Sequence, residues 1–93
     1  MGYSKAQHNM GMLYEEGEGV SQCYSEAAEW YRKASEQGYA PSQNNLGSLY
    51  ATGKGVKQDL KYALELYNRA SQGGDENARD NYESLKIRLR KAK

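Results

Sequence analysis

The sequence lacks phenylalanine altogether and holds one cysteine, one proline and one histidine among its 93 residues. A single cysteine, Cys23, cannot form an internal disulfide, which excludes a disulfide-stapled framework. No apolar run approaches the roughly 18 residues that span a bilayer, and no hydrophobic segment typical of a signal peptide follows the first residues. We therefore expect no membrane insertion, and a cytoplasmic chain as written, exported only if an upstream signal was removed.

The chain also lacks a strong charge of either sign, because 13 basic and 12 acidic side chains leave a net charge of +1. This balance gives no overall attraction to nucleic acid or to anionic lipid. Only 38% of the residues are hydrophobic, which disfavours one deep core and fits thin layers buried between neighbouring elements. Tyrosine is abundant and suits such layers, because its ring packs inward while its hydroxyl reaches a polar partner at the edge.

What the sequence does contain is an internal repeat with a period of 36 residues. The segment 10–20 returns as 46–56, and the segment 27–38 returns as 63–74. The identical pairs include Gly11 and Gly47, Leu13 and Leu49, Tyr14 and Tyr50, Gly17 and Gly53, Val20 and Val56, Ala27 and Ala63, Tyr31 and Tyr67, and Ala34 and Ala70. A fixed period of this length is typical of stacked helix pairs.

Apolar residues within each repeat recur at helical spacing, which predicts five helices. These helices run over about 4–16, 23–37, 40–52, 59–72 and 75–91. We call the first helix of each repeat the A helix and the second the B helix, so that the fifth helix is a third A helix. We expect an all-α fold with a single repeat domain over residues 1–93. Its parts are repeat 1 (about 3–38), repeat 2 (about 39–74) and a C-terminal capping helix (about 75–93).

Four kinds of position predict how the helices pack and where they begin and end. Gly11 and Gly47 lie inside the A helices, where glycine costs about 1 kcal/mol relative to alanine, so we expect a neighbouring helix to come too close there for a side chain. Gly17 is expected to end the first A helix in a left-handed backbone conformation. Asp59 is the predicted N-cap of the second B helix. Cys23 stands at the equivalent position in repeat 1 and is a poorer cap.

These residues resemble the Sel1-like repeats (SLR), relatives of the tetratricopeptide repeats. The similarity lies in three motifs that occur in each repeat. In repeat 1 they are Met10-Gly11-Met12-Leu13-Tyr14, Gly17-Glu18-Gly19-Val20 and Ala27 with Trp30-Tyr31-Arg32-Lys33-Ala34. In repeat 2 they are Leu46-Gly47-Ser48-Leu49-Tyr50, Gly53-Lys54-Gly55-Val56 and Ala63 with Leu66-Tyr67 and Ala70. The resemblance implies a right-handed α-solenoid of two antiparallel helix hairpins plus a C-terminal capping helix. It also implies an adaptor that holds proteins together.

Several residues invite a chemical role, and each is better explained by structure. The Gly-x-Gly segments join helix to helix, whereas phosphate-binding loops follow a strand. His8 has no accompanying set of metal ligands, so we expect a solvated or partner-facing histidine, and Cys23 has no neighbouring base. Adjacent Glu15 and Glu16 point in different directions on a helix. The basic segment 86–93 is interpreted as a charged capping face. We predict no catalytic residue, no cofactor, no metal and no nucleic-acid partner.

The binding surface is predicted from the resemblance to tetratricopeptide arrays, in which A helices line a concave groove. The candidates are A-helix residues outside the structural stripe, namely Lys5, His8, Met12, Glu15, Glu16, Asn44, Ser48, Ala51, Thr52, Asp80, Ser84 and Arg88. The first hypothesis is a non-catalytic adaptor that binds a peptide or a protein domain there, anchored by residues such as Met12.

The second hypothesis is a structural segment of a longer or self-stacking repeat array. Ala6, Met10, Leu13 and Tyr14 form one apolar stripe of the first A helix. No capping helix precedes this stripe in the sequence. We therefore expect the front end around Tyr3, Ala6 and Met10 to stack on further repeats or on another copy of the chain.

Overall fold

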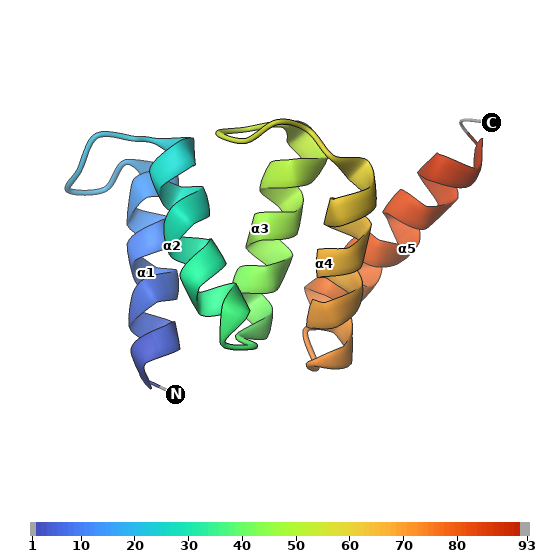
Figure 1. The fold of residues 1–93 in the computed structure, drawn as a ribbon, viewed down its shortest axis with the longest axis horizontal. Coiled ribbons are helices and arrows are strands. Elements are labelled where there is room, and N and C mark those ends of the chain that lie inside the picture. The colour runs from blue at the N-terminus through green and yellow to red at the C-terminus, as the bar shows by residue number, and fades with distance from the viewer. Residues whose placement is uncertain (1, 92–93) are drawn as a thin grey trace.

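The computed structural model describes residues 2–91, and five α-helices account for most of them. The helices are α1 (Gly2–Glu16), α2 (Tyr24–Glu36), α3 (Ala40–Thr52), α4 (Leu60–Gln72) and α5 (Glu76–Lys91). They stand side by side in chain order along the longest axis of a body of 42 × 26 × 17 Å (Figure 1). No strand occurs within residues 2–91. The predicted all-α repeat fold is therefore confirmed.

The A helices α1 and α3 each end at a glycine whose backbone is left-handed. Gly17 has a φ of 74° and Gly53 has a φ of 73°, a conformation that costs glycine little. Their N–H groups donate to the carbonyls of Leu13 and Leu49, both at 2.8 Å. The chain then crosses to the following B helix, which confirms that the Gly-x-Gly segments connect helix to helix.

The internal glycines mark the closest approach of A and B helices. A Cβ atom on Gly11 would lie 2.6 Å from ring carbons of Tyr31 in α2. A Cβ atom on Gly47 would lie 2.9 Å from the ring of Tyr67 in α4. Both distances are shorter than van der Waals contact allows, so the predicted reason for these glycines is confirmed.

The N-caps of the helices also differ as predicted. The carboxylate of Asp59 accepts a hydrogen bond from the backbone N–H of Tyr62 at 3.0 Å. Cys23 takes the same extended backbone conformation but makes no side-chain cap bond to α2. Asp75 caps α5 by accepting from the N–H of Ala78 at 3.1 Å, so α5 begins one residue later than its predicted start.

The core consists of thin layers between successive helices, as the composition predicts. The larger cluster joins the two repeats and contains Ala27, Ala28, Tyr31, Leu46, Leu49 and Leu66, each no more than 2% exposed. The smaller cluster joins repeat 2 to α5 through Ala63, Tyr67 and Leu85. Ala78 and Leu85 are buried, while Tyr82 and Leu89 are half-buried. These four residues recur at helical spacing, so the apolar stripe of α5 faces α4 and the core.

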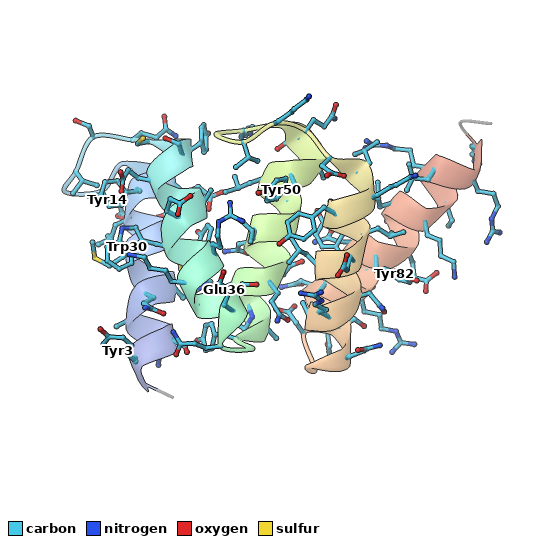
Figure 2. The ribbon with its side chains drawn as sticks, viewed as in Figure 1. Tyr3, Tyr14, Trp30, Glu36, Tyr50 and Tyr82 are labelled. Carbon is cyan, nitrogen blue, oxygen red and sulfur yellow. The ribbon has the colours of Figure 1, made fainter. Side chains whose placement is uncertain are left out.

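The apolar stripe of α1 has a different environment from its counterpart in α3. Leu46 and Leu49 are 0% and 2% exposed because α2 covers them, whereas Leu13, at the register of Leu49, is 37% exposed. Ala6 is also exposed, and Met10 is half-buried. We define the front face as Tyr3, Ala6, Met10, Leu13 and Trp30. Figure 2 shows Tyr3 and Trp30 at the α1 end of the row of helices.

Candidate binding surface on the A helices

The three A helices run in the same direction, because each hairpin returns the chain to the edge where it began (Figure 1). Their C-terminal halves consequently lie along one edge of the molecule, with the 17–23 and 53–59 connections. We define the A-helix wall as the surface of α1, α3 and α5 that carries the predicted binding residues.

A groove of about 250 Å³ opens in this wall between α3 and α5. Its lining residues are Ser48, Ala51, Thr52, Tyr67, Asn81, Ser84, Leu85 and Arg88. Five of the sequence candidates, Ser48, Ala51, Thr52, Ser84 and Arg88, are thus brought together at one place. The groove combines an apolar floor with hydroxyl, carboxamide and guanidinium groups, a mixture typical of sites that bind and orient a ligand.

Hydrogen bonds fix the side chains on the α3 side of this groove. The hydroxyls of Ser48 and Tyr67 lie 3.0 Å apart, and the Thr52 hydroxyl donates to the Ser48 carbonyl at 2.8 Å. Asn81 donates its amide to the Asn44 side-chain oxygen at 2.9 Å and so ties α5 to α3. These bonds hold the groove in shape before any ligand binds.

Arg88 supplies the positive charge of the groove. Its side chain is exposed on α5, and among residues 2–91 it forms no ion pair with a carboxylate. Its guanidinium therefore keeps all five N–H donors available for a ligand.

The prediction that His8 is solvated or faces a partner is wrong. The side chain is only 9% exposed and is not solvated or partner-facing. Its Nδ1 lies 2.7 Å from the Ser42 hydroxyl of α3, and its ring packs against Tyr31 and Tyr39 at centroid distances of 5.4 and 5.3 Å. Burial lowers the pKa of His8, and the charges of Glu15 and Asp75 only partly oppose this effect.

The prediction that Asn44 belongs to the binding surface is also wrong, because its side chain is 9% exposed. It occupies in repeat 2 the position that His8 occupies in repeat 1, and α5 covers it through Asn81. The physical reason is that successive A helices pack directly against one another at this position. Asp80 follows at the same register in α5 and is exposed, because no further A helix follows it within the described residues.

The α1 part of the wall is acidic. Glu16 is exposed and Glu15 is half-buried, with the Tyr31 hydroxyl donating to Glu15 Oε1 at 2.6 Å. Burial and this carboxylate raise the pKa of Tyr31 well above its ordinary value. Met12 is 36% exposed, and Lys5 is exposed nearer the start of α1.

Three groove residues were not among the sequence candidates. The sequence places Tyr67 in the repeat motif of a B helix. Its ring packs under Gly47, but its hydroxyl reaches the groove. Asn81 and Leu85 lie one turn apart on α5 and face α3. The repeat register could have found Asn81, because a polar residue stands at this position in all three A helices, as Asn9, Asn45 and Asn81.

The remaining reactive groups are the acidic side chains, His8 and the Cys23 thiol. Within residues 2–91, no three His, Cys, Asp or Glu side chains lie close enough together to hold a metal ion. The Cys23 thiol has a lowered pKa because the Ser25 hydroxyl, 3.2 Å away, hydrogen-bonds it.

None of the helices described is long and apolar enough to pass through a bilayer.

Comparison with known families gives two successive matches to the Sel1 repeat, at residues 4–39 and 40–75. A Sel1 repeat protein from Oxalobacter formigenes is 42% identical with a TM-score of 0.82, over 87% of this chain and 33% of that one. A protective antigen of uropathogenic Escherichia coli with an SLR fold is 38% identical with a TM-score of 0.80, over 83% of this chain and 16% of that one.

Helicobacter pylori cysteine rich protein B is 29% identical with a TM-score of 0.77, and the alignment covers 81% of this chain and 56% of that protein. This chain thus spans less than two thirds of each of these three structures. A sequence comparison with curated proteins finds no match.

Proposed function

Because this chain belongs to the Sel1 repeat family, whose repeats generally mediate interactions between proteins, we propose that it is a non-catalytic adaptor. It binds a peptide or a domain of another protein on the A-helix wall. The observation that supports this function is the groove between α3 and α5, which gathers five side chains expected at a binding surface. Residues 1–93 then act as one repeat domain.

The wall offers both kinds of contact that a protein interface uses. Met12 is a large apolar side chain that is 36% exposed, and such side chains supply binding energy when a partner covers them. The hydroxyls of Ser48, Ser84 and Tyr67 and the carboxamide of Asn81 supply polar contacts that set the register of a bound segment.

The test compares a wall variant with a matched control. The wall variant carries Met12→Glu, Thr52→Glu and Ser84→Glu, which replace exposed residues of all three A helices and place two carboxylates in the groove. The control carries Ser21→Glu, Ser25→Glu and Gln72→Glu at exposed positions outside the A helices. Both variants add the same charge, and circular dichroism checks that both fold.

Peptides are selected against the wild-type chain from a random display library, and their affinities for all three proteins are measured. We expect the control to bind like the wild type and the wall variant to bind at least about tenfold more weakly, a change of about 1.4 kcal/mol. Equal affinity for a folded wall variant would contradict the proposed face. A loss in the control as well would mean that binding is not confined to the wall.

The front face supports a second function, as a stacking segment of a repeat array. We infer that it receives the B helix of a further repeat of this type. In repeat 2, α3 covers α2 through Ser42, Leu46 and Leu49, which are 0%, 0% and 2% exposed. The equivalent residues of α1 lie in the front face, where a hollow of about 270 Å³ lies between Met10 and Trp30.

A fusion tests this second function directly. Residues 39–74 are repeated ahead of Tyr3, so that the added B helix meets α1 in the register in which α2 meets α3. Burying a Met or Leu side chain fully contributes about 1.5–3 kcal/mol, so we expect the fusion to unfold at clearly higher denaturant concentration.

The control fusion carries Met10→Lys and Leu13→Lys and should lose this gain. Equal stability of the two fusions would count against stacking at the front face. Light scattering of the unfused chain over a concentration series shows separately whether a second copy occupies the same face.

A further inference from the structure

The groove between α3 and α5 is rich in hydrogen-bond donors and has no carboxylate in its lining. Arg88 offers its guanidinium, and Asn81 keeps a second amide N–H after bonding Asn44. Ser48 and Tyr67 share one hydrogen bond, which leaves one of their two hydroxyl protons free. Donors that converge around one guanidinium favour an anionic acceptor, and a carboxylate matches the planar fork of arginine.

The position of Arg88 in the wall is neutral one repeat earlier and acidic two repeats earlier. Arg88 of α5 corresponds to Thr52 of α3 and to Glu16 of α1, and Ala51 in the groove corresponds to Glu15. The Tyr31 hydroxyl holds the Glu15 carboxylate at 2.6 Å. Along the C-terminal halves of the A helices, the wall therefore changes from acidic at α1, through neutral at α3, to basic at α5.

The other charges of the wall lie away from this edge. Lys5 precedes Glu16 by about three helical turns, or roughly 16 Å along α1. Asp80 precedes Arg88 by about two turns, or roughly 12 Å along α5. Exposed charges separated by more than about 8–10 Å are strongly screened at physiological salt, so Glu16 and Arg88 dominate at their own ends.

We propose that the groove between α3 and α5 binds a carboxylate of a partner segment and that Glu15 and Glu16 bind a lysine or arginine of the same segment. This proposal rests on the function proposed above and adds the chemistry of the ligand. Directly packed helices lie about 8–10 Å apart, so two steps along the wall separate α1 from α5 by at least about 20 Å. An extended chain advances about 3.3 Å per residue, which places the two charges at least about six residues apart.

The probe is a random twelve-residue peptide library, used in one form with both ends fused and in another with a free C-terminus. Selection against the wild-type chain should enrich an acidic group and a basic residue that are at least about six residues apart. Enrichment in the fused form assigns the carboxylate to an aspartate or glutamate side chain. Enrichment only in the free form assigns it to the terminal carboxylate.

Arg88→Glu and its matched control Arg90→Glu then make the test specific. Both replace an exposed arginine of α5, but Arg90 lies outside the groove, beside Leu64 and Leu89. We expect Arg88→Glu to weaken the binding of a selected peptide at least about tenfold. Selection against the Arg88→Glu chain should enrich basic residues at the peptide position that is acidic in peptides selected by the wild type. Arg90→Glu should leave both the affinity and the selection unchanged.

The outcomes separate this proposal from the function on which it rests. Peptides that need the wall but show no acidic enrichment, or that bind the Arg88→Glu chain equally well, overturn the charge assignment and leave the adaptor function standing. Failure of both library forms to yield any peptide that depends on the wall overturns both proposals.

Discussion

The Nδ1 atom of His8 lies 2.7 Å from the hydroxyl oxygen of Ser42, a hydrogen bond that joins two successive A helices. The two residues are only 9% and 0% exposed. At the same register one repeat later, Asn44 accepts a hydrogen bond from Asn81 of α5 at 2.9 Å. A polar contact between A helices thus recurs at the register of His8 and Asn44, although its partner lies at a different register and Asn81 is only half-buried.

This contact predicts how stability depends on pH. Burial lowers the pKa of His8 below its ordinary value of 6.5, so the unfolded chain binds a proton more readily than the folded chain. The His8 contribution to the free energy of unfolding is therefore constant above about pH 6.5 and falls as the pH drops below that value. Urea unfolding at pH 7.5 and at pH 5.0 measures the loss.

His8→Asn is the matched comparison for this prediction, because asparagine occupies the equivalent position in repeat 2 and does not titrate. Carboxylates common to both proteins contribute equally to their pH dependence. We expect the wild type to lose more stability than the variant on acidification. Parallel pH profiles would mean that His8 binds a proton as readily in the folded chain as in the unfolded one, because its imidazole reaches water in the folded state.

Gly11→Ala should destabilise the chain by up to about 2 kcal/mol, because overpacking usually costs about 1–3 kcal/mol and the helix gains about 1 kcal/mol from alanine. The added methyl group would lie 2.6 Å from the Tyr31 ring, and this clash outweighs the gain of about 1 kcal/mol in helix propensity. Gly47→Ala should cost less, because its nearest ring atom is 2.9 Å away. Chemical denaturation measures both, and an unchanged or raised stability for Gly11→Ala would show that α1 and α2 separate without penalty.

The sequence predicts the fold well because the residues that pack one helix against the next occur in both repeats. The glycines at 11 and 47, the left-handed turns at 17 and 53 and the apolar stripes of the B helices recur at a fixed spacing, and two copies distinguish a packing rule from chance. Apolar periodicity also finds which side of α5 is buried, since its exposed side is almost entirely polar.

The same reasoning fails where polar residues are buried. Ser4 and His8 lie with Gly11 on the side of α1 that is covered by its neighbours. Gly11 predicts a close helix contact there, but Ser4 and His8 are not apolar, so periodicity does not predict that they are buried. The groove was found only in part for a related reason. The ring of Tyr67 packs in the core and its hydroxyl reaches the surface. The sequence pattern predicts only the packing of the ring.

Cys23→Asp should stabilise the chain by about 0.5–2 kcal/mol, the range measured for good N-caps. The backbone at Cys23 has φ −156° and ψ 104°, close to the φ −150° and ψ 96° of Asp59. A carboxylate at position 23 can therefore accept from the N–H of Glu26 as Asp59 accepts from Tyr62. Asp59→Ala should cost a similar amount, and thermal unfolding of both variants tests the pair. A Cys23→Asp chain no more stable than the wild type would refute this equivalence.

Tyr31→Phe and Tyr67→Phe compare the same position in the two repeats. Each substitution keeps the ring that packs under Gly11 or Gly47 and removes only the hydroxyl. The Tyr31 hydroxyl donates to the Glu15 carboxylate at 2.6 Å, whereas the Tyr67 hydroxyl shares a neutral hydrogen bond with Ser48 at 3.0 Å.

Hydrogen bonds to charged groups contribute about 1.5–3 kcal/mol and neutral ones about 0.5–1.5 kcal/mol. We therefore expect Tyr31→Phe to lower the free energy of unfolding more than Tyr67→Phe, measured by urea denaturation at neutral pH. Glu15→Gln, which keeps an acceptor oxygen but removes the charge, should bring the cost of Tyr31→Phe close to that of Tyr67→Phe. The reverse order of the two tyrosine variants would mean that the Glu15 carboxylate is better solvated by water than bound by Tyr31, and that the acidic end of the wall is not held in place.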